Sequence, residues 1–331
     1  MKKRSIEVSA IENIVSILFT HSRQSHWRYR ENCPGISCQY CQEPHRQKIQ
    51  ASIQKQEAIT LILPAFPAKS ANREKTISAK PDLGERLSLV RLNAICQQIS
   101  AIYPIGVKLY LCSDGRVFND LVLVNDEEVN LYQQGIKAII KQEKLTFLKT
   151  FALDEIYPNA TYNEMRKQLM MTHGEALEIL KQRLKPQTPE RYQFDGIHRF
   201  IFEDQRALRT DLSKNKLRKL TKLITYEVVR RSNAWSRLLA AEFPSSVRLS
   251  IHPQPCGSDK LGIQFLPANN RWATPWHNVL LKKGNNCQFV KRSEAEALGA
   301  KFNHDHYVLE NAPGFDHSPT FDRFYHRESL R

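Results

Sequence analysis

The chain has 331 residues, and 49 Lys and Arg against 34 Asp and Glu leave a formal net charge of +15. An apolar fraction of 41% with few Gly and Pro excludes a disordered or collagen-like protein. No apolar run reaches the roughly 20 residues of a membrane helix, and the basic start lacks the apolar stretch of a signal peptide. We therefore expect a soluble, cytoplasmic protein.

The spacing of apolar residues predicts alternating helices and strands in the first half of the chain. We expect helices over residues 5–20, 44–57, 83–103 and 126–142, and strands over 59–63, 107–112 and 145–151. Long helices are expected over 161–183 and 214–242, followed by short strands over 247–251, 262–266, 287–291 and 306–309. This order predicts an α/β fold with a largely parallel sheet, flanking helices and a C-terminal group of short strands.

The composition along the chain indicates three parts, without an internal repeat or a clear linker. Residues 1–58 form a helical segment with a cysteine-containing loop, residues 59–310 form the main α/β domain, and residues 311–331 form a polar tail.

The cysteines fall into two groups. Cys96, Cys112, Cys256 and Cys287 stand singly in apolar or mixed segments, as reduced core thiols do. The run CPGISCQYCQEPH brings together possible zinc ligands, namely Cys33, Cys38, Cys41 and His45. A polar loop with incidental thiols is the alternative, and we assign no metal and no cofactor.

The basic charge predicts an anionic partner, but known nucleotide motifs are missing. The sequence has no Gly-x-Gly and no Gly-Lys-Ser/Thr, so neither the dinucleotide fingerprint nor the P-loop is present. Lys214, Arg218 and Lys222 form a basic stripe along an expected helix, and a solvated helix face is its simplest interpretation. Without a zinc-finger, RRM or KH pattern, nucleic-acid binding would depend on charge alone, and we expect none.

Two loops that follow expected strands carry dense polar and charged residues. Ligands of open α/β sheets bind beyond the carboxyl ends of the strands, so these loops are candidate sites. The first loop offers donors suited to a phosphate or carboxylate: Lys69, Ser70, Asn72 and Arg73. The second combines both signs of charge and a possible base: Asp114, Arg116 and Asp120. An ordinary turn with solvated charges is the alternative for each loop.

Two later segments add candidate histidines. Alternation over residues 247–253 puts Arg248, Ser250 and His252 on one strand face. Thr274, Trp276 and His277 follow in the next segment, where an imidazole stands beside indole rings. Histidine among Arg, Thr and Trp favours a site for an aromatic, charged substrate.

The segments LPAFPAKSANR, LCSDGRVFNDLV, RLSIHPQP and TPWHNV, in this order, closely resemble the isonitrile synthase family of pyoverdine/dityrosine biosynthesis proteins. The resemblance runs from about residue 55 to 310. It implies a Rossmann-like fold and a carbon-carbon lyase that needs no metal, nicotinamide or ATP. The amine of L-tyrosine or L-tryptophan would condense with ribulose 5-phosphate, leaving one sugar carbon on nitrogen as an isocyanide. Hydroxyacetone, formaldehyde and phosphate are the implied co-products, and an iron/2-oxoglutarate oxygenase is the implied consumer of the isonitrile.

The resemblance also implies roles for the candidate residues. Proton transfers would involve Asp114, Asp120, His252 and His277, with Lys69 as phosphate ligand or Schiff-base former. Phosphate would lie against the loop of residues 69–73 and Arg116, the amino-acid carboxylate against Arg248, and the amine or ring near Thr274, Trp276 and His277. We expect L-tyrosine as substrate, with L-tryptophan as the alternative. Arg199, Glu203 and Tyr226 are weaker candidates, and we expect Glu203 and Asp204 to be surface charges.

Two other functions stay open from the sequence. One is a different sugar-phosphate lyase, aldolase or isomerase that uses the same anion-binding loops. The other, from a different class, is a basic nucleic-acid-binding module with a zinc-stabilised N-terminus.

Overall fold

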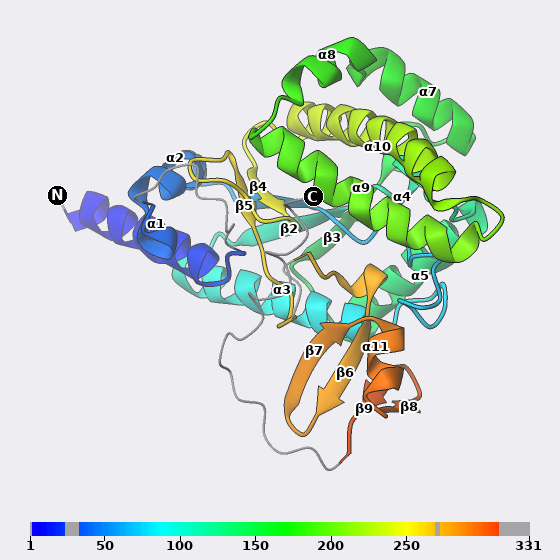
Figure 1. Cartoon of the computed structure of the whole chain (residues 1–331). Helices are drawn as coiled ribbons and strands as arrows, with labels where there is room; N and C mark the ends of the chain where they lie inside the picture. Colours follow the sequence, from blue (N-terminus) through cyan, green and yellow to red (C-terminus); the bar gives the residue numbers. More distant parts are fainter. Residues whose placement is uncertain (1, 24–32, 269–271, 311–331) are drawn as a thin grey trace.

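A five-stranded parallel sheet lies at the centre of the computed structural model, which describes residues 2–23, 33–268 and 272–310 (Figure 1). The strands run in the order β3-β2-β1-β4-β5, and every neighbouring pair is parallel. Their bounds are β1 (Ile59–Pro64), β2 (Val107–Cys112), β3 (Leu148–Phe151), β4 (Val247–Ser250) and β5 (Lys260–Gly262). The expected Rossmann-like α/β class is confirmed.

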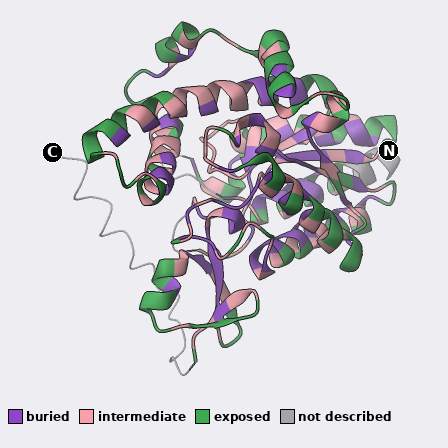
Figure 2. Ribbon diagram, turned by 90° about the vertical axis from the view of Figure 1, so that its right-hand side faces the viewer, coloured by how far each residue is buried: buried purple, intermediate pink, exposed green. Residues whose placement is uncertain are grey.

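Helices cover both faces of this sheet, so its strands are buried (Figure 2). In β1, Leu61 and Leu63 face one core and Ile62 faces the other, as the two-residue period of a strand requires. The first core includes α1 (Lys2–Thr20), α2 (Gln39–Lys55), α3 (Leu83–Ile102) and α5 (Asp126–Gln142). The second is built with α7 (Tyr162–His173) and α10 (Lys214–Glu242).

Several helices begin where the sequence predicted, and others differ from the prediction. Capping boxes at Asp82 and Asn125 begin α3 and α5 at the expected positions. The expected single helix over 161–183 is wrong, because Gly174 adopts an extended conformation and separates α7 from α8 (Leu177–Arg183). The sequence analysis missed α9 (Pro189–Leu208), which Thr188 caps.

The C-terminal strands form a second sheet in the order β7-β6-β9-β8. The expected group of short strands is present. The strand expected over residues 262–266 is wrong, because the strand at this point, β5, ends at Gly262. After Gly262 the chain leaves the sheet, and Ile263 forms an antiparallel bridge with Ser22 beyond α1. Leu280 and Phe289 join this sheet to the main core. Its elements are β6 (Val279–Lys283), β7 (Asn286–Val290), α11 (Arg292–Ala297), β8 (Lys301–Asn303) and β9 (His306–Val308).

The topology creates one switch point in the central sheet. From β1 the chain builds β2 and β3 on one side, and it then returns through α6 (Leu153–Ile156) and α7 to α10 to place β4 on the other side. The loops after β1 and β4 therefore diverge, and such a crevice is where open α/β sheets bind ligands. Three short helices belong to nearby loops: η1 (Gly35–Ser37), α4 (Gly115–Phe118) and η2 (Pro275–His277).

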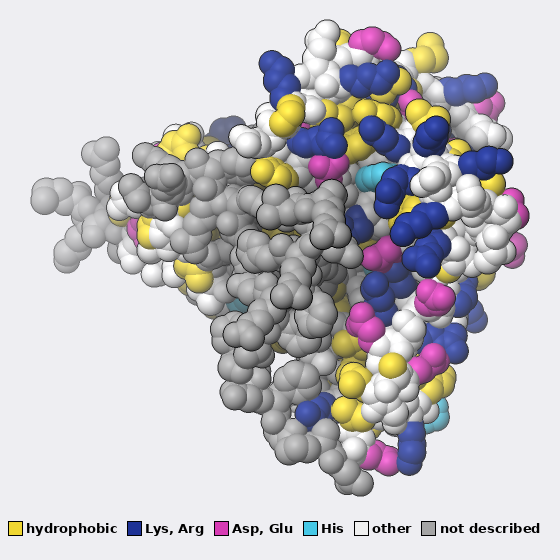
Figure 3. Space-filling view, viewed as in Figure 1, with side chains coloured by type: hydrophobic (Ala, Val, Ile, Leu, Met, Phe, Trp, Pro, Cys, Tyr) yellow, Lys and Arg dark blue, Asp and Glu magenta, His cyan; other side chains and the backbone are white. Residues whose placement is uncertain are grey.

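The outer surface carries much of the positive charge. Lys and Arg side chains gather over the region of α9 and α10 (Figure 3). Lys214, Arg218 and Lys222 are exposed along α10, as a solvated helix face requires. Within the described part of the chain, every helix is too short or too polar to cross a membrane. The expected tail over 311–331 lies outside the described residues.

Candidate active site

Buried charges meet at the switch point between the loop after β1 and helix α9. Nζ of Lys75 lies 2.5 Å from Oδ1 of Asp204 and 3.1 Å from Oε2 of Glu203. Nδ1 of His277 lies 3.5 Å from the second oxygen of Asp204, and Lys291 also pairs with Glu203 at 3.2 Å. We call Lys75, Glu203, Asp204, His277 and Lys291 the switch-point cluster. Its two carboxylates face two lysines and one imidazole, so both signs of charge meet beside a histidine.

The environment keeps Asp204 ionised. Burial opposes its charge, but His277 and Lys75 beside it outweigh burial and lower the pKa of Asp204 to about 2. The same competition between burial and the charges of Lys75 and Lys291 lowers the pKa of Glu203. The expectation that both are surface charges is wrong for Asp204, which is buried, and Glu203 is half-buried. The buried face of the amphipathic helix α9 contains Ile201, Asp204 and Gln205, a pattern that could have revealed this carboxylate.

Aromatic rings line the side of the cluster. The ring of Phe200 lies 5.5 Å from His277 and 6.4 Å from Trp272, and Trp272 lies 4.8 Å from His252. Lys75 lies 5.2 Å above the ring of Phe200. His252, which follows β4, and His277 of η2, expected together from the sequence, are thus linked through two aromatic side chains. Phe200 and Lys75 were missed: Phe200 stands in an apolar stretch of α9, and Lys75 lies just beyond the residues of the first loop that we singled out.

His252 is neutral at physiological pH. The residue is partly buried, and this burial, followed by the charges of Arg23 and Lys260, lowers its pKa to about 3. Its Nδ1 is buried without a hydrogen-bond partner among the described residues. A buried orphan nitrogen costs free energy unless a ligand or water satisfies it, which marks His252 as a functional candidate.

Asp114 ends β2 at the same edge of the sheet. Burial raises its pKa to about 7, against the opposing effect of its own backbone amide, and its Oδ1 has no partner among the described residues. A carboxyl that titrates near neutrality suits general acid–base chemistry. Its loop packs tightly on the first loop, because a Cβ at Gly115 would lie 2.2 Å from the carbonyl oxygen of Pro67.

Lys69 lies in the protein core, a position that differs from the one expected of a phosphate ligand. Its ammonium contacts Asp82 at 2.7 Å, Glu85 at 2.9 Å and the carbonyl oxygen of Pro275 at 2.9 Å. These contacts use all three donors of the ammonium, so no donor remains for a phosphate or for proton transfer. The side chain is fully buried and joins the β1 loop to the start of α3 and to η2.

The rest of the first loop and η2 hold each other in place. The Ser70 amide donates to the carbonyl of Trp276 at 2.8 Å, and the Asn72 side chain donates to the carbonyl of Glu203 at 3.4 Å. Trp276 is buried against Phe66 at 5.3 Å, so it anchors the core. The hydroxyl of Thr274 is buried without a partner among the described residues.

The structure does not bring the four remaining candidates to the switch-point cluster, and each has a partner of opposite charge. Arg73 pairs with Glu128 at 3.3 Å, and Arg116 pairs with Asp154 at 3.2 Å. Asp120 accepts from Arg231 at 2.7 Å. Arg248 lies 3.7 Å from Asp259 and also contacts Ser236. Arg116 and Asp120 belong to ion pairs that join α4 to α6, α7 and α10.

The weaker candidates Arg199 and Tyr226 do not join the switch-point cluster by any contact described. Arg199 is exposed on α9. Tyr226 packs against Phe194 between α9 and α10, with ring centroids 4.7 Å apart.

Cys33, Cys38 and Cys41 cluster with Cys256 and not with His45, which the sequence had suggested as the fourth ligand. The sulfurs of Cys33, Cys38, Cys41 and Cys256 all lie within 4.8 Å of one another. Cys256 is therefore not the isolated core thiol we expected. His45 packs against Phe19 instead, with ring centroids 5.8 Å apart.

The sequence matches the model of the pyoverdine/dityrosine biosynthesis protein family over residues 49–302. It is 43% identical over 289 residues to the L-tryptophan isonitrile synthase AmbI2 of Fischerella ambigua, covering 87% of each chain. It is 38% identical over 258 residues to an L-tyrosine isonitrile synthase of Pseudomonas aeruginosa, covering 77% of this chain and 79% of that one.

The fold agrees with these relatives. The crystal structure of PvcA from Pseudomonas aeruginosa superposes with a TM-score of 0.85 at 34% identity, covering 91% of this chain and 99% of that one. The chain therefore belongs to the pyoverdine/dityrosine biosynthesis family of isonitrile synthases.

Proposed function

We propose that this isonitrile synthase converts the amine of an aromatic L-amino acid into an isocyanide, with ribulose 5-phosphate as carbon donor. The observation that carries the proposal is the switch-point cluster, in which lysines, an imidazole and carboxylates meet beside Phe200 and Trp272. The two substrates bring a phosphate, a carboxylate and an aromatic ring, and this set of side chains suits all three. As a carbon-carbon lyase, the enzyme would release hydroxyacetone, formaldehyde and phosphate.

His277 is the proposed general base at the reacting amine. Because Asp204 faces Nδ1, Nε2 is the nitrogen proposed to accept a proton from the substrate. Asp204 then stabilises the imidazolium that forms, as a buried carboxylate does for a catalytic histidine. The side chain of His277 is partly exposed, so a substrate can reach it.

Asp114 is proposed to carry the later proton transfers, and His252 is proposed to act as a hydrogen-bond acceptor. Imine formation, enolisation and elimination need a group that both gives and takes protons near neutral pH, and the pKa of Asp114, at about 7, meets that need. Neutral His252 can accept a hydrogen bond through its unpartnered Nδ1. Lys291, half-exposed on the cluster, is the proposed phosphate ligand in place of Lys69.

L-Tryptophan is the preferred substrate in this proposal, and L-tyrosine, expected from the sequence, is the second candidate. Two relatives named L-tryptophan isonitrile synthases are 43% and 40% identical to the chain, and two named L-tyrosine isonitrile synthases are 38% and 37% identical. Consumption of the product by an iron/2-oxoglutarate oxygenase and a cytoplasmic location stay predictions. So do the expected roles of Arg73, Arg116, Asp120 and Arg248.

Mass spectrometry of the purified enzyme with ribulose 5-phosphate and either amino acid tests the proposal. We expect a product with one more carbon and two fewer hydrogens than the amino acid, together with hydroxyacetone. His277→Gln should abolish it, whereas His306→Gln, on the small sheet beside Asp305, should not. Loss of the sugar phosphate without an isonitrile would favour an aldolase instead.

A further inference from the structure

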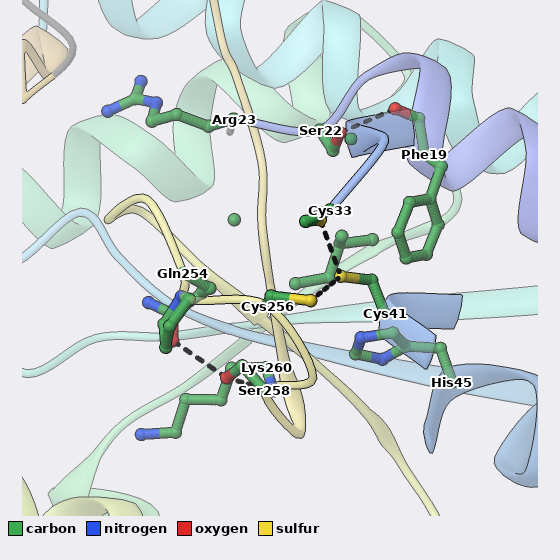
Figure 4. Close-up of a pocket in the computed structure, with 14 residues that line it drawn as sticks. Phe19, Ser22, Arg23, Cys33, Cys41, His45, Gln254, Cys256, Ser258 and Lys260 are labelled. Atoms are coloured by element: carbon green, nitrogen blue, oxygen red, sulfur yellow. Dashed lines mark hydrogen bonds between the residues drawn. The ribbon is translucent and has the colours of Figure 1, made fainter. Parts of the chain in front are cut away.

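We propose that Cys33, Cys38, Cys41 and Cys256 bind one structural zinc ion, which joins the segment before α2 to the loop between β4 and β5. The four thiols come from two parts of the chain that are far apart in sequence. Cys33 precedes η1, Cys41 stands in the first turn of α2, and Cys256 follows β4 (Figure 4). Cys38 directly precedes α2. This site is independent of the proposed reaction.

The distances between sulfurs fit a single tetrahedral ion. Cys41 lies 3.3 Å from Cys256, Cys33 lies 3.8 Å from Cys41, and Cys38 lies 3.9 Å from Cys256. Zinc–sulfur bonds of about 2.3 Å in tetrahedral geometry require sulfurs about 3.8 Å apart. The thiols are free, because a disulfide would need sulfurs about 2 Å apart. An iron–sulfur cluster would spread its cysteines more widely, since several irons and sulfides separate the ligands.

The surrounding backbone is arranged as it is at metal–thiolate centres. The amide of Cys41 faces the sulfur of Cys38, and the amide of Gly257 faces the sulfur of Cys41. Amides directed at the sulfurs stabilise thiolates bound to a metal. Gly257 has a φ of +78°, and a Cβ there would lie 2.1 Å from the ring of Tyr40. Glycine is therefore required for the turn that directs Cys256 toward the other three thiols.

Nearby cations balance the charge that the site would carry. Four thiols that release their protons to bind zinc leave a net charge of −2 on the centre. Arg23 and Lys260 line the pocket that also contains Cys33, Cys41 and Cys256. Basic side chains in the same pocket lower the electrostatic cost of such a dianionic centre.

The metal would also hold the loop that carries His252. Gln254 lies between His252 and Cys256, and its side chain donates to the carbonyl of His252 and to the hydroxyl of Ser250. Fixing Cys256 to α2 therefore restrains the segment immediately after β4. The role of the zinc is structural, since all four coordination positions are filled by protein.

Metal analysis of the full-length protein, purified under reducing conditions, tests the proposal. We expect about one zinc per chain in the wild type and in Cys287→Ser, whose thiol lies on β7 outside the cluster. Cys256→Ser should lose most of the zinc and unfold at a lower temperature.

A second measurement covers the case in which Cys256→Ser does not fold. Wild-type protein stripped by a chelator in the presence of reductant should bind one cobalt ion, with the intense absorption of tetrahedral cobalt and its thiolate charge-transfer bands. Zinc-free protein that gives these bands would still support the site. Zinc-free protein without them, stoichiometric iron, or a mass loss from disulfides among these cysteines would each overturn the zinc assignment.

Discussion

Asp204 on α9 faces Nδ1 of His277 on η2 at 3.5 Å, although 72 intervening residues carry the chain through α10 and back through the sheet. The carboxylate is buried and simultaneously pairs with Lys75 at 2.5 Å. One acidic side chain thus connects the loop after β1 with the histidine at the opposite side of the switch point. Removal of this carboxylate should affect both the orientation of the His277 imidazole and the stability of the protein.

We expect Asp204→Asn to lower kcat by roughly 10²-fold, because the amide cannot stabilise a protonated His277. It should also cost about 3 kcal/mol or less of unfolding free energy, since Lys75 keeps Glu203 as a partner. Steady-state kinetics and urea unfolding measure the two effects. Asp195→Asn on the same helix removes only an exposed pair with Arg191 and should cost within about 0.5 kcal/mol. An unchanged kcat in Asp204→Asn would limit Asp204 to a structural role.

Asp114 should make the protein less stable as pH rises. Its pKa is about 7 in the folded protein, against an ordinary 3.8, so between these values the folded state binds more protons than the unfolded state. Stability from this group is therefore greatest at low pH and declines as pH rises toward 7. Urea unfolding at about pH 5 and about pH 8 should show a smaller loss in Asp114→Asn than in wild type.

A second buried carboxyl acts in the same direction, so the comparison needs the variant. Burial raises the pKa of Glu85 to about 8 despite Lys69 beside it, and this contribution is common to both proteins. Equal pH dependence in wild type and Asp114→Asn would mean that Asp114 titrates in its ordinary range.

Lys69→Met should destabilise the protein by about 3–5 kcal/mol, because it leaves the buried carboxylate of Asp82 without its cation and removes the contact of the ammonium with Glu85. Thermal unfolding measures this loss, and Lys80→Met, an exposed lysine of the same loop, is the control. At a temperature where the variant stays folded, the KM for ribulose 5-phosphate should change little. A large rise in that KM with unchanged stability would instead make Lys69 a phosphate ligand.

Trp272→Ala should raise the KM for the amino acid more than the KM for the sugar phosphate. The indole contacts His252 and Phe200, so its loss removes apolar surface suited to an aromatic side chain. Kinetics with each substrate varied in turn separate the two effects. Phe302→Ala, an exposed aromatic residue on β8, is the control. Equal changes in both KM values would mean that Trp272 supports the site without contacting the ring.

Local signals were sufficient for most of the secondary structure. The strand of residues 59–63 and the helices of 126–142 and 214–242 have their own apolar period and caps, so their positions follow from neighbouring residues alone. The break at Gly174 and the end of β5 at Gly262 were missed. The second depends on pairing of Ile263 with Ser22, a partner 241 residues away that no local pattern contains.

The candidate site was predictable by region and less so by residue. The carboxyl ends of β1, β2 and β4 were correctly expected to carry polar loops, because strands and the turns after them have local signatures. Lys69 and Lys75 stand in the same loop, and only their partners distinguish them. Lys69 meets Asp82 and Glu85, whereas Lys75 meets two carboxylates of α9.

By itself, the sequence determined the α/β class, the order of most elements and the resemblance to isonitrile synthases, because these depend on periodicity and on motifs that are contiguous in the chain. Only the tertiary structure decided which charges are buried together and that Cys256, rather than His45, completes the cysteine cluster. Burial and ion pairing depend on distances between residues that are remote in sequence. Those distances exist only once the helices have packed on the sheet.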